Sequence, residues 1–194
     1  MRKIMNRQRL EKFAKMAAES YTKDPVHVYA TKSEERRKKF LYHFLIERLA
    51  TSNREDIIYF DEEDRGICVF RKAHNDYTLF DFLLCPNWVF LVVYLSSTIR
   101  TLSFFSHLKP KKVFDKNTYL ISPVFVHKEH QGKGIATQLI TKGVNDLVAQ
   151  GYNIGLETQN PDNVPFYEKL GFKVIEHNYY EKEKIHNYYM LYNK

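Results

Sequence analysis

Cysteine is scarce in this sequence: Cys68 and Cys85 are the two cysteines among 194 residues. Two cysteines cannot form the set of several disulfides that holds a small secreted domain together. No C-x-x-C pair is present either, so the sequence shows no cysteine-based metal motif. We therefore expect a reduced, cytoplasmic protein in which both cysteines belong to the core.

Long hydrophobic runs are also missing. The most apolar stretch, residues 82–95, contains Pro86 and Asn87. It falls short of the roughly 20 apolar residues that a membrane-spanning helix needs. Residues 1–20 lack the apolar segment of a secretory signal. These absences predict a protein without a membrane partner.

Positive charge is in excess, and the excess lies in the first 40 residues. The formal net charge is +7, and residues 1–40 alone hold 12 basic and 5 acidic side chains. Such a segment could attract nucleic acid or an anionic membrane surface. No nucleic-acid-binding module accompanies it, so we expect solvated helix faces and no nucleic-acid partner. Steep salt dependence of binding would favour the alternative.

The length suits a single domain spanning residues 1–194, and no repeat or linker divides it. In the first half, apolar spacing predicts two helices, the first ending at Asp24-Pro25 and the second capped by Ser33. A hairpin follows, with Gly66 expected at positive φ in its turn. An aromatic segment comes next, predicted as helices interrupted at Pro86. The helices are predicted at residues 10–17 and 34–49, the hairpin strands at 56–60 and 67–71, and the aromatic segment at 77–108.

The second half alternates between strands and helices. This order indicates an α/β (α+β) protein with a mixed sheet that helices flank. Gly151 is expected at the residue after the longer helix, in the left-handed conformation. The predicted strands are 119–126, 152–158, 172–175 and 185–192, and the predicted helices are 135–150 and 163–170.

A glycine-containing turn joins the strand ending at Val126 to the following helix. Gly132 and Gly134 permit backbone conformations that other residues rarely adopt. The N-terminus of the helix presents unpaired N–H groups and the positive end of its dipole, which suits a phosphate or pyrophosphate. The spacing is neither that of a P-loop nor G-x-G-x-x-G. A purely structural tight turn therefore stays an alternative.

Two motifs carry a resemblance to a known family. Gln131-x-x-Gly134-x-Ala136 is similar to the acetyl-CoA signature of the GNAT superfamily of N-acetyltransferases. Residues 156–160, followed by residues 163–172, resemble the second cofactor-binding motif of that family. The resemblance implies a GNAT fold of the bacterial small-molecule type. Its mixed, mostly antiparallel sheet would be splayed at the cofactor site, with residues 1–117 on the acceptor side and 118–194 as the acetyl-CoA-binding core.

The resemblance also implies which residues bind acetyl-CoA, the cosubstrate. The main chain of Val124 and Val126 would pair with the pantetheine arm like an added strand. The N–H groups of residues 131–136 would hold the pyrophosphate, and Asn163 would bind pantetheine or orient the loop. The predicted cofactor-binding residues are Val124, Phe125, Val126, Gln131, Gly132, Lys133, Gly134, Ile135, Ala136, Asn160 and Asn163.

Tyr167 and Glu157 are the predicted catalytic residues. By the resemblance, the phenol of Tyr167 would protonate the departing CoA thiolate, although a packing role for this aromatic ring stays open. Many family members carry an acidic residue on the strand before the turn, but residues 119–126 contain none. The base is therefore Glu157, a water chain, a residue of the first half, or absent. Asn163 has a competing interpretation as a helix N-cap, and His127 and His130 are expected to be surface residues without a metal.

The resulting functional prediction is an N-acetyltransferase that moves an acetyl group from acetyl-CoA to a primary amine of a small molecule. The reaction would be direct attack by the amine, and residues 77–108 would form much of the acceptor pocket. Two alternatives stay open, a protein or peptide acetyltransferase and an acyl-CoA-binding protein without catalysis. A homodimer is a candidate assembly, although no residue in the sequence identifies an interface.

Overall fold

The computed structural model describes residues 6–50, 56–74 and 92–193. Cys85, Pro86 and most of the apolar part of the predicted acceptor segment lie outside these residues. The chain groups into two compact units, which are described separately. The first comprises Met1–Arg54 and Asp76–Leu108, and the second comprises Glu55–Asn75 and Lys109–Lys194.

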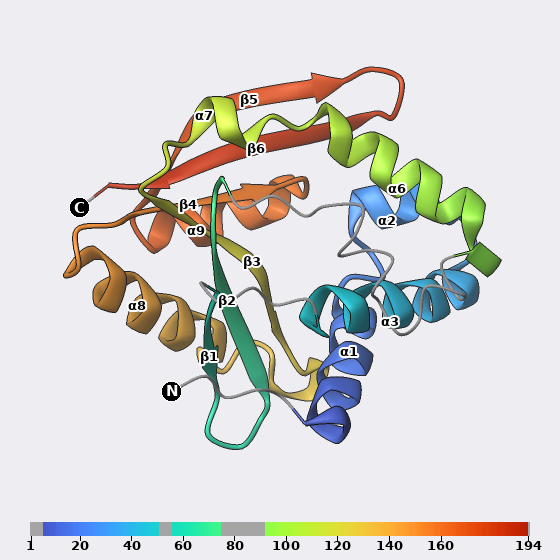
Figure 1. Cartoon of the computed structure of the whole chain (residues 1–194), viewed down its shortest axis with the longest axis horizontal. Helices are drawn as coiled ribbons and strands as arrows, with labels where there is room; N and C mark the ends of the chain where they lie inside the picture. The colour runs from blue at the N-terminus through green and yellow to red at the C-terminus, as the bar shows by residue number, and fades with distance from the viewer. Residues whose placement is uncertain (1–5, 51–55, 75–91, 194) are drawn as a thin grey trace. The chain divides into compact units, whose positions relative to one another are not determined.

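The described part of the first unit is helical (Figure 1). Helix α1 packs against α3, and α2 packs against α6. Ser33 caps α3 as predicted, because its Oγ accepts a hydrogen bond from the Arg36 N–H at 3.4 Å. Among the described residues, no helix has both the length and the apolarity that crossing a bilayer requires. The helices are α1 (Arg7–Ser20), α2 (Pro25–Ala30), α3 (Glu34–Ala50) and α6 (Leu95–His107).

Helix α2 was not predicted from the sequence. Asp24 and Pro25 were expected only to end the first helix, but they also begin the next one. The Asp24 carboxylate accepts a hydrogen bond from the Val26 N–H at 3.0 Å, and Pro25 occupies the first helical position. Both residue types favour a helix N-terminus, and six residues are too few to show a clear apolar period.

A buried histidine, His27, lies on α2. Its side chain is 7% exposed, and its Nδ1 has no hydrogen-bond partner among the described residues. Burial lowers the pKa of His27, the nearby Asp24 carboxylate opposes this effect, and the Arg37 guanidinium adds to it. Burial also raises the pKa of Asp24. The neutral imidazole is therefore the form that this packing favours.

This burial predicts a loss of stability in mild acid. Because the pKa of His27 is lower in the folded chain than its ordinary value of 6.5, the unfolded chain binds more protons below that pH. The free energy of unfolding should fall as the pH drops through that value. The pKa of Asp24 is raised from 3.8, so protonation of Asp24 increases the free energy of unfolding as the pH falls toward that value.

Urea denaturation of the wild type and of His27→Gln, at neutral pH and in mild acid, measures this effect. The variant should lose less stability on acidification than the wild type. His107→Gln, at an exposed position of α6, is the control and should behave like the wild type. An unchanged pH dependence in His27→Gln would remove His27 as the cause.

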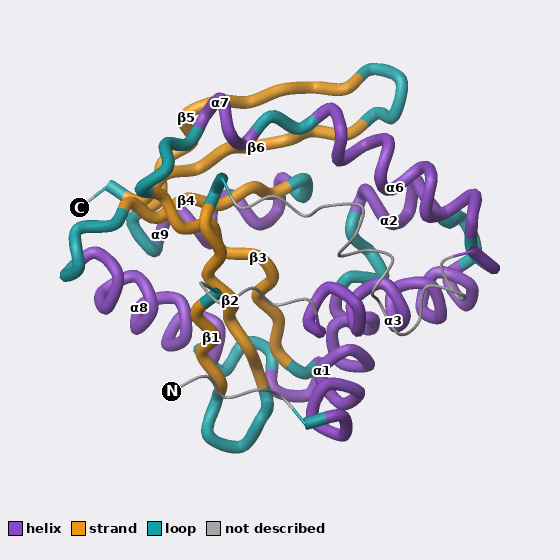
Figure 2. The backbone as a smooth tube through the Cα atoms, in the orientation of Figure 1, coloured by secondary structure: helices purple, strands orange, loops and turns teal. Residues whose placement is uncertain are grey.

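The second unit is built on a six-stranded sheet with the order β1-β2-β3-β4-β6-β5 (Figures 1 and 2). Strands β3 and β4 are parallel, and every other neighbouring pair is antiparallel. This confirms the predicted mixed, mostly antiparallel sheet. The strands are β1 (Ile57–Phe60), β2 (Gly66–Lys72), β3 (Thr118–Val126), β4 (Asn153–Thr158), β5 (Phe172–Tyr180) and β6 (Ile185–Tyr192).

Two helices cover one face of this sheet and close the main core. The apolar side of α8 packs on β2, β3 and β4, and α9 packs on β5. A Cβ atom on Gly143 of α8 would lie 2.2 Å from the Phe70 ring, so the close approach of α8 to β2 requires glycine there. On the opposite face, Phe114 packs against Tyr189. The helices of this unit are α7 (Pro110–Val113), η1 (Lys128–His130), α8 (Ile135–Val148), η2 (Pro161–Asn163) and α9 (Val164–Lys169).

Two local predictions in this unit were wrong. Gly66 is not among the glycines with positive φ, and in this turn Asp64 adopts that conformation, with φ 56°. Gly66 is instead required by space, because a Cβ atom there would lie 3.0 Å from Ile135 Cγ2 and 3.1 Å from Val126 Cγ2. Strand β5 was predicted to end at residue 175 but continues to Tyr180, paired with β6. Its far half is largely exposed and lacks the apolar alternation that reveals a strand.

Candidate active site

The β3–β4 ladder opens halfway along its length. The parallel pairing runs from Thr118↔Asn153 to Ile121↔Leu156 and ends there. Beyond that point β3 continues to Val126 paired with β2, after a register shift opposite Cys68 and Phe70, and β4 continues to Thr158 paired with β6. Pro123 lies two residues after the last pair on β3, which is at Ile121, and has no N–H to donate to a ladder. The strands therefore separate where the resemblance implied a splay.

The glycine turn lies between the end of β3 and the start of α8. Gly132 and Gly134 have φ values of 76° and 78°, in the left-handed region that favours glycine. Residues 131–134 are exposed, and α8 begins at Ile135 with Gly134 as its N-cap. A Cβ atom on either glycine would meet nothing within 4 Å, so the surface over the turn is open.

The start of α8 offers N–H groups to a ligand. Among the described residues, Gln138 is the first whose N–H bonds back into α8. It donates to the Gly134 carbonyl at 3.0 Å. The amides before it have no acceptor in the helix, as at any helix N-terminus. No acidic residue lies in the first turn of α8, and Lys133 adds a positive charge next to it. The turn can therefore bind an anion electrostatically.

Side-chain contacts hold the turn in place. Gln131 Nε2 donates to the Val126 carbonyl at 3.2 Å, which ties the turn to the end of β3. His127 Nδ1 accepts from the Glu129 N–H at 3.3 Å. His127, Glu129 and His130 have ligand atoms within 4.8 Å of one another, but Lys133 Nζ lies 3.4 Å from His130 Nδ1. A lysine at that distance disfavours a cation, and the expected absence of a metal stays a prediction.

The loop after β4 is fixed by two asparagines. Asn160 Oδ1 accepts from the Asp162 N–H at 3.1 Å. Asn163 occupies the N-cap position of α9 but makes no side-chain cap bond, and its Nδ2 donates to Thr158 Oγ1 at 3.3 Å. Asn163 is therefore the N-cap residue of α9, as the competing interpretation had it, but without the side-chain hydrogen bond of a cap. Thr158, which was not singled out from the sequence, connects this loop to the open end of β4.

Tyr167 lies on α9, in the main core, on the face of the sheet that α8 and α9 cover. Its side chain is 8% exposed, and its ring contacts those of Phe166 and Phe172 at centroid distances of 5.2 and 5.9 Å. Burial raises the pKa of its phenol, and the nearby Cys68 of β2 contributes in the same direction. Tyr167 therefore keeps its proton at neutral pH, which is the state a general acid needs.

Glu157 lies on the opposite face of the sheet from Tyr167. Successive side chains of a strand point to opposite faces, and Leu156 belongs to the core cluster that contains Tyr167. Glu157 pairs across the ladder with Tyr189, whose hydroxyl accepts from the Lys109 N–H at 2.9 Å. Burial, and then the charge of Glu157, raise the pKa values of Tyr180 and Tyr189. The two predicted catalytic residues are therefore on different faces beside the same opening.

The face that carries Glu157 holds a buried amide that sequence reasoning missed. Asn187 of β6 is fully buried, and its Oδ1 accepts a hydrogen bond from Gln159 Nε2. Its Nδ2 has no hydrogen-bond partner among the described residues. Polar residues alternating along a terminal strand are usual on a solvated face, so the sequence offered no signal for this burial.

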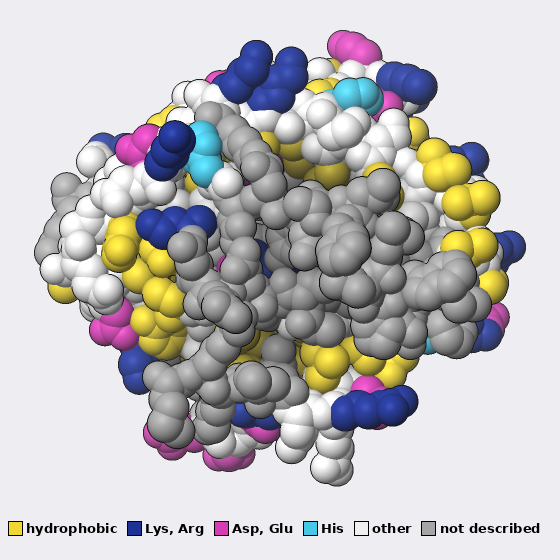
Figure 3. All heavy atoms as spheres, in the orientation of Figure 1, with side chains coloured by type: hydrophobic (Ala, Val, Ile, Leu, Met, Phe, Trp, Pro, Cys, Tyr) yellow, Lys and Arg dark blue, Asp and Glu magenta, His cyan; other side chains and the backbone are white. Residues whose placement is uncertain are grey.

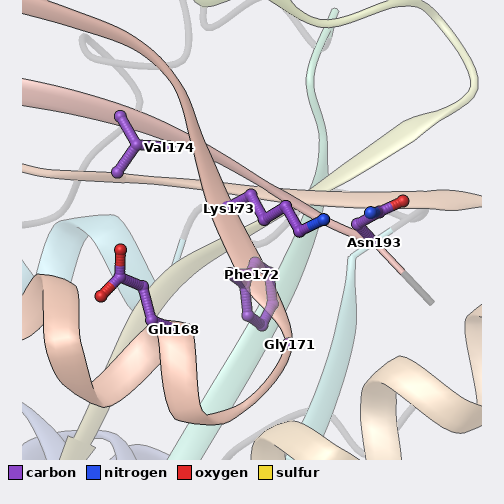
Figure 4. A pocket seen from close by; sticks show the side chains of 6 residues that line it. All are labelled: Glu168, Gly171, Phe172, Lys173, Val174 and Asn193. Carbon is purple, nitrogen blue, oxygen red and sulfur yellow. The ribbon is translucent and has the colours of Figure 1, made fainter.

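A separate hollow lies where α9 turns into β5 at Gly171 (Figure 4). None of the residues predicted for the cofactor or for catalysis lines it. It therefore adds nothing to the site beside the β3–β4 opening. Its lining residues are Glu168, Gly171, Phe172, Lys173, Val174 and Asn193.

Known proteins share sequence features and the fold with this chain. Residues 112–191 match the family model described as an acetyltransferase (GNAT) domain. The matched range contains the β3–β4 opening, the glycine turn and α9. Residues 112–191 are therefore similar to a GNAT acetyltransferase domain.

Solved structures share the fold along nearly the whole chain. An N-acetyltransferase from Staphylococcus aureus Mu50 is similar with a TM-score of 0.65 and 14% identity, covering 97% of each chain. The PaiA N-acetyltransferase from Thermoplasma acidophilum, solved in complex with coenzyme A, has a TM-score of 0.57 and 15% identity. That match covers 99% of this chain and 97% of the other. At these identities the likeness shows the fold alone.

Proposed function

We propose that the protein transfers an acetyl group from acetyl-CoA to a primary amine of a small molecule. The observation that supports this most directly is the opening of the β3–β4 ladder beside an exposed glycine turn at the N-terminus of α8. Both features lie within the range that matches the GNAT domain. Residues 1–194 would act as one cytoplasmic enzyme.

The residues around the opening fit the chemical groups of acetyl-CoA. The N–H groups of residues 131–136 would bind the pyrophosphate, because the turn is open and no acidic residue lies in the first turn of α8. Val124, Phe125 and Val126 lie on the part of β3 beyond its pairing with β4, where an extended amide chain can align with a strand. Asn160 and Asn163 would hold the far side of the opening. When bound, acetyl-CoA supplies an activated acetyl thioester.

Tyr167 would act as the general acid. The amine nitrogen forms a bond to the acetyl carbonyl carbon, the carbon–sulfur bond breaks, and the sulfur receives the proton of the Tyr167 hydroxyl. The amine loses one proton, which passes to Glu157 or to water. Because Glu157 and Tyr167 lie on opposite faces of the sheet, the acceptor would approach from the Glu157 face and the thiolate would leave toward Tyr167.

The Glu157 face would also help select the acceptor. The carboxylate can attract an ammonium group, and the unpartnered Asn187 Nδ2 can donate a hydrogen bond to a neutral polar group of the substrate. One carboxylate with phenols and amides around it favours a small amine of low positive charge.

Two alanine substitutions at glycines of similar conformation test the cofactor site. Gly134 and Gly151 have φ values of 78° and 85°, and a Cβ atom on either would meet nothing within 4 Å. Both variants therefore carry a similar backbone penalty of about 1–2 kcal/mol. Gly134→Ala should weaken CoA binding by about tenfold or more, since the loss of one well-placed hydrogen bond to a charged group accounts for that factor. Gly151→Ala should bind CoA like the wild type.

Isothermal titration with CoA and with acetyl-CoA measures both variants. Thermal unfolding of each variant shows whether the two penalties are equal. Equal weakening in both variants would mean that stability, and not contact with CoA, controls the affinity. Wild-type protein that binds neither compound at micromolar concentration would contradict the proposed function.

A further inference from the structure

Asn187 of β6 is a buried amide with one group left over. The side chain is 0% exposed, and its Oδ1 accepts a hydrogen bond from Gln159 Nε2. Its Nδ2 has no hydrogen-bond partner among the described residues. A buried donor without an acceptor is costly, because it has lost its hydrogen bond to water without a replacement. Such a donor calls for an acceptor atom that these residues do not supply, such as an oxygen of a ligand.

Strand register places Asn187 beside a row of carboxylates. Tyr189 of β6 pairs with Glu157 of β4 on one side and with Glu176 of β5 on the other. The three strands lie side by side in the order β4, β6, β5 (Figures 1 and 2). Asn187 lies two residues before Tyr189, so both side chains belong to the same face of the sheet. We call Glu157, Tyr189 and Glu176 the carboxylate row.

A row of amides runs next to the carboxylate row. Asn187 pairs with Asn178 of β5, and the Gln159 side chain reaches Asn187 from the end of β4. Asn178 Nδ2 donates to Glu176 Oε1 at 2.7 Å, so this amide already has an acceptor. Two residues along a strand span roughly 6.5–7 Å, which is therefore the spacing of the two rows. We call Gln159, Asn187 and Asn178 the amide row.

The rows combine a partly exposed rim with a buried floor. Glu157 and Gln159 are partly exposed and Glu176 is exposed, whereas Tyr189 and Asn187 are buried. The turn between β5 and β6 brings charges of both signs to the surface, at the top of Figure 3. In that turn, residues 181–184 are two glutamates and two lysines, which balance. The two glutamates of the carboxylate row therefore remain, and they favour an ammonium group and disfavour an anion.

A primary amine that carries an uncharged oxygen satisfies both rows. Its ammonium group would lie against Glu157, and an oxygen roughly 6–7 Å away would accept a hydrogen bond from Asn187 Nδ2. A carboxamide oxygen meets this need, and a carboxamide carries no negative charge toward Glu176. A second ammonium group has only donors and cannot accept from Nδ2.

We propose that Asn187 selects, as acetyl acceptors, primary amines that carry a carboxamide or another uncharged carbonyl group. This inference rests on the proposed function, because it names the substrate class of the same site.

Four amines of similar chain length test the proposal on the wild type. They are 4-aminobutanamide, n-pentylamine, 4-aminobutanoate and 1,4-diaminobutane, compared by kcat/KM through the release of free thiol from acetyl-CoA. The value for 4-aminobutanamide should exceed each of the others by about tenfold or more, because the others leave the buried donor unpaired or bring an unfavourable charge.

Three variants connect the preference to Asn187. Asn187→Leu removes the donor, so the advantage of 4-aminobutanamide over n-pentylamine should disappear. Asn187→Asp replaces the donor with a carboxylate and should shift the preference toward 1,4-diaminobutane. Asn178→Leu is the matched control, because it removes an amide of the same row whose Nδ2 already has an acceptor, and it should keep the preference. Circular dichroism identifies a variant that fails to fold.

Two outcomes would overturn the proposal. The first is a wild type that uses 4-aminobutanamide and n-pentylamine equally well or prefers the diamine. The second is a preference for the amide that folded Asn187→Leu and Asn187→Asp both retain, which would mean that an internal water satisfies Nδ2.

Titration separates these outcomes from a failure of the proposed function. Wild-type protein that binds CoA but shows no preference for the amide keeps the proposed acetyl transfer and loses the role of Asn187. If none of the four amines is acetylated, direct titration with 4-aminobutanamide and n-pentylamine decides. Tighter binding of the amide that is lost in Asn187→Leu supports the proposal, and equal or absent binding overturns it.

Discussion

Replacing Tyr167 with phenylalanine should lower kcat by about 100-fold or more, the usual contribution of a positioned general acid. The ring and its packing against Phe166 and Phe172 are retained, so the KM for acetyl-CoA should change little. The effect is measured by release of free thiol, with a primary amine that supports turnover in a screen. Tyr192→Phe is the control, because Tyr192 also packs against Phe172 but stands outside the proposed site.

The pH profile separates an acid role from packing. Burial raises the pKa of the Tyr167 phenol, so ionisation of this group should not reduce kcat anywhere in the neutral and mildly alkaline range. A falling limb of kcat near neutral pH would have to come from another group. Wild-type rates in Tyr167→Phe would show that the side chain only packs, the alternative that the sequence left open.

Replacing Asp56 with alanine should lower the free energy of unfolding by about 3–5 kcal/mol. Asp56 Oδ2 lies 3.3 Å from Arg71 Nε, and the two side chains are 0% and 4% exposed. Removing the carboxylate takes a buried counter-charge away from the guanidinium of Arg71, which lies on β2. Urea denaturation at neutral pH measures the loss.

An exposed ion pair provides the contrast. Glu35 and Lys39 are also in contact, at 2.9 Å, but their side chains are 81% and 62% exposed. Glu35→Ala should therefore destabilise the protein much less than Asp56→Ala does. The double variant Asp56→Ala with Arg71→Met should recover much of the loss, because it removes both charges. If the double variant is no more stable than Asp56→Ala, the cost comes from lost packing and not from an uncompensated charge.

The second half of the fold could be predicted from the sequence because its signals are local and agree with one another. The apolar period of α8, Gly151 at φ 85° after it and Gly171 at φ 92° after α9 each fix one boundary. The glycine turn was recognised for the same reason, since Gly132 and Gly134 have conformations that few other residues adopt.

What could not be predicted depends on contacts between distant residues. Asn187 looks like a surface residue until β6 is placed beside β4, where Gln159 reaches it. Gly66 was assigned to a turn conformation, although the side chains of Ile135 and Val126 are what require it. The opposite faces of Glu157 and Tyr167 likewise follow from strand register, which a sequence pattern does not give by itself.

The half-open β3–β4 ladder has a thermodynamic consequence. Four residue pairs of this parallel ladder join an antiparallel block of β1, β2 and β3 to another of β4, β6 and β5. A ligand that lies between β3 and β4 contacts both blocks at the end where the two strands are not paired. Such a ligand binds the folded chain and not the unfolded chain. By mass action, each tenfold rise in ligand above its dissociation constant then adds about 1.4 kcal/mol to the stability of the sheet. The concentration of the cofactor would thus set how long the protein stays folded, through its binding at the β3–β4 opening.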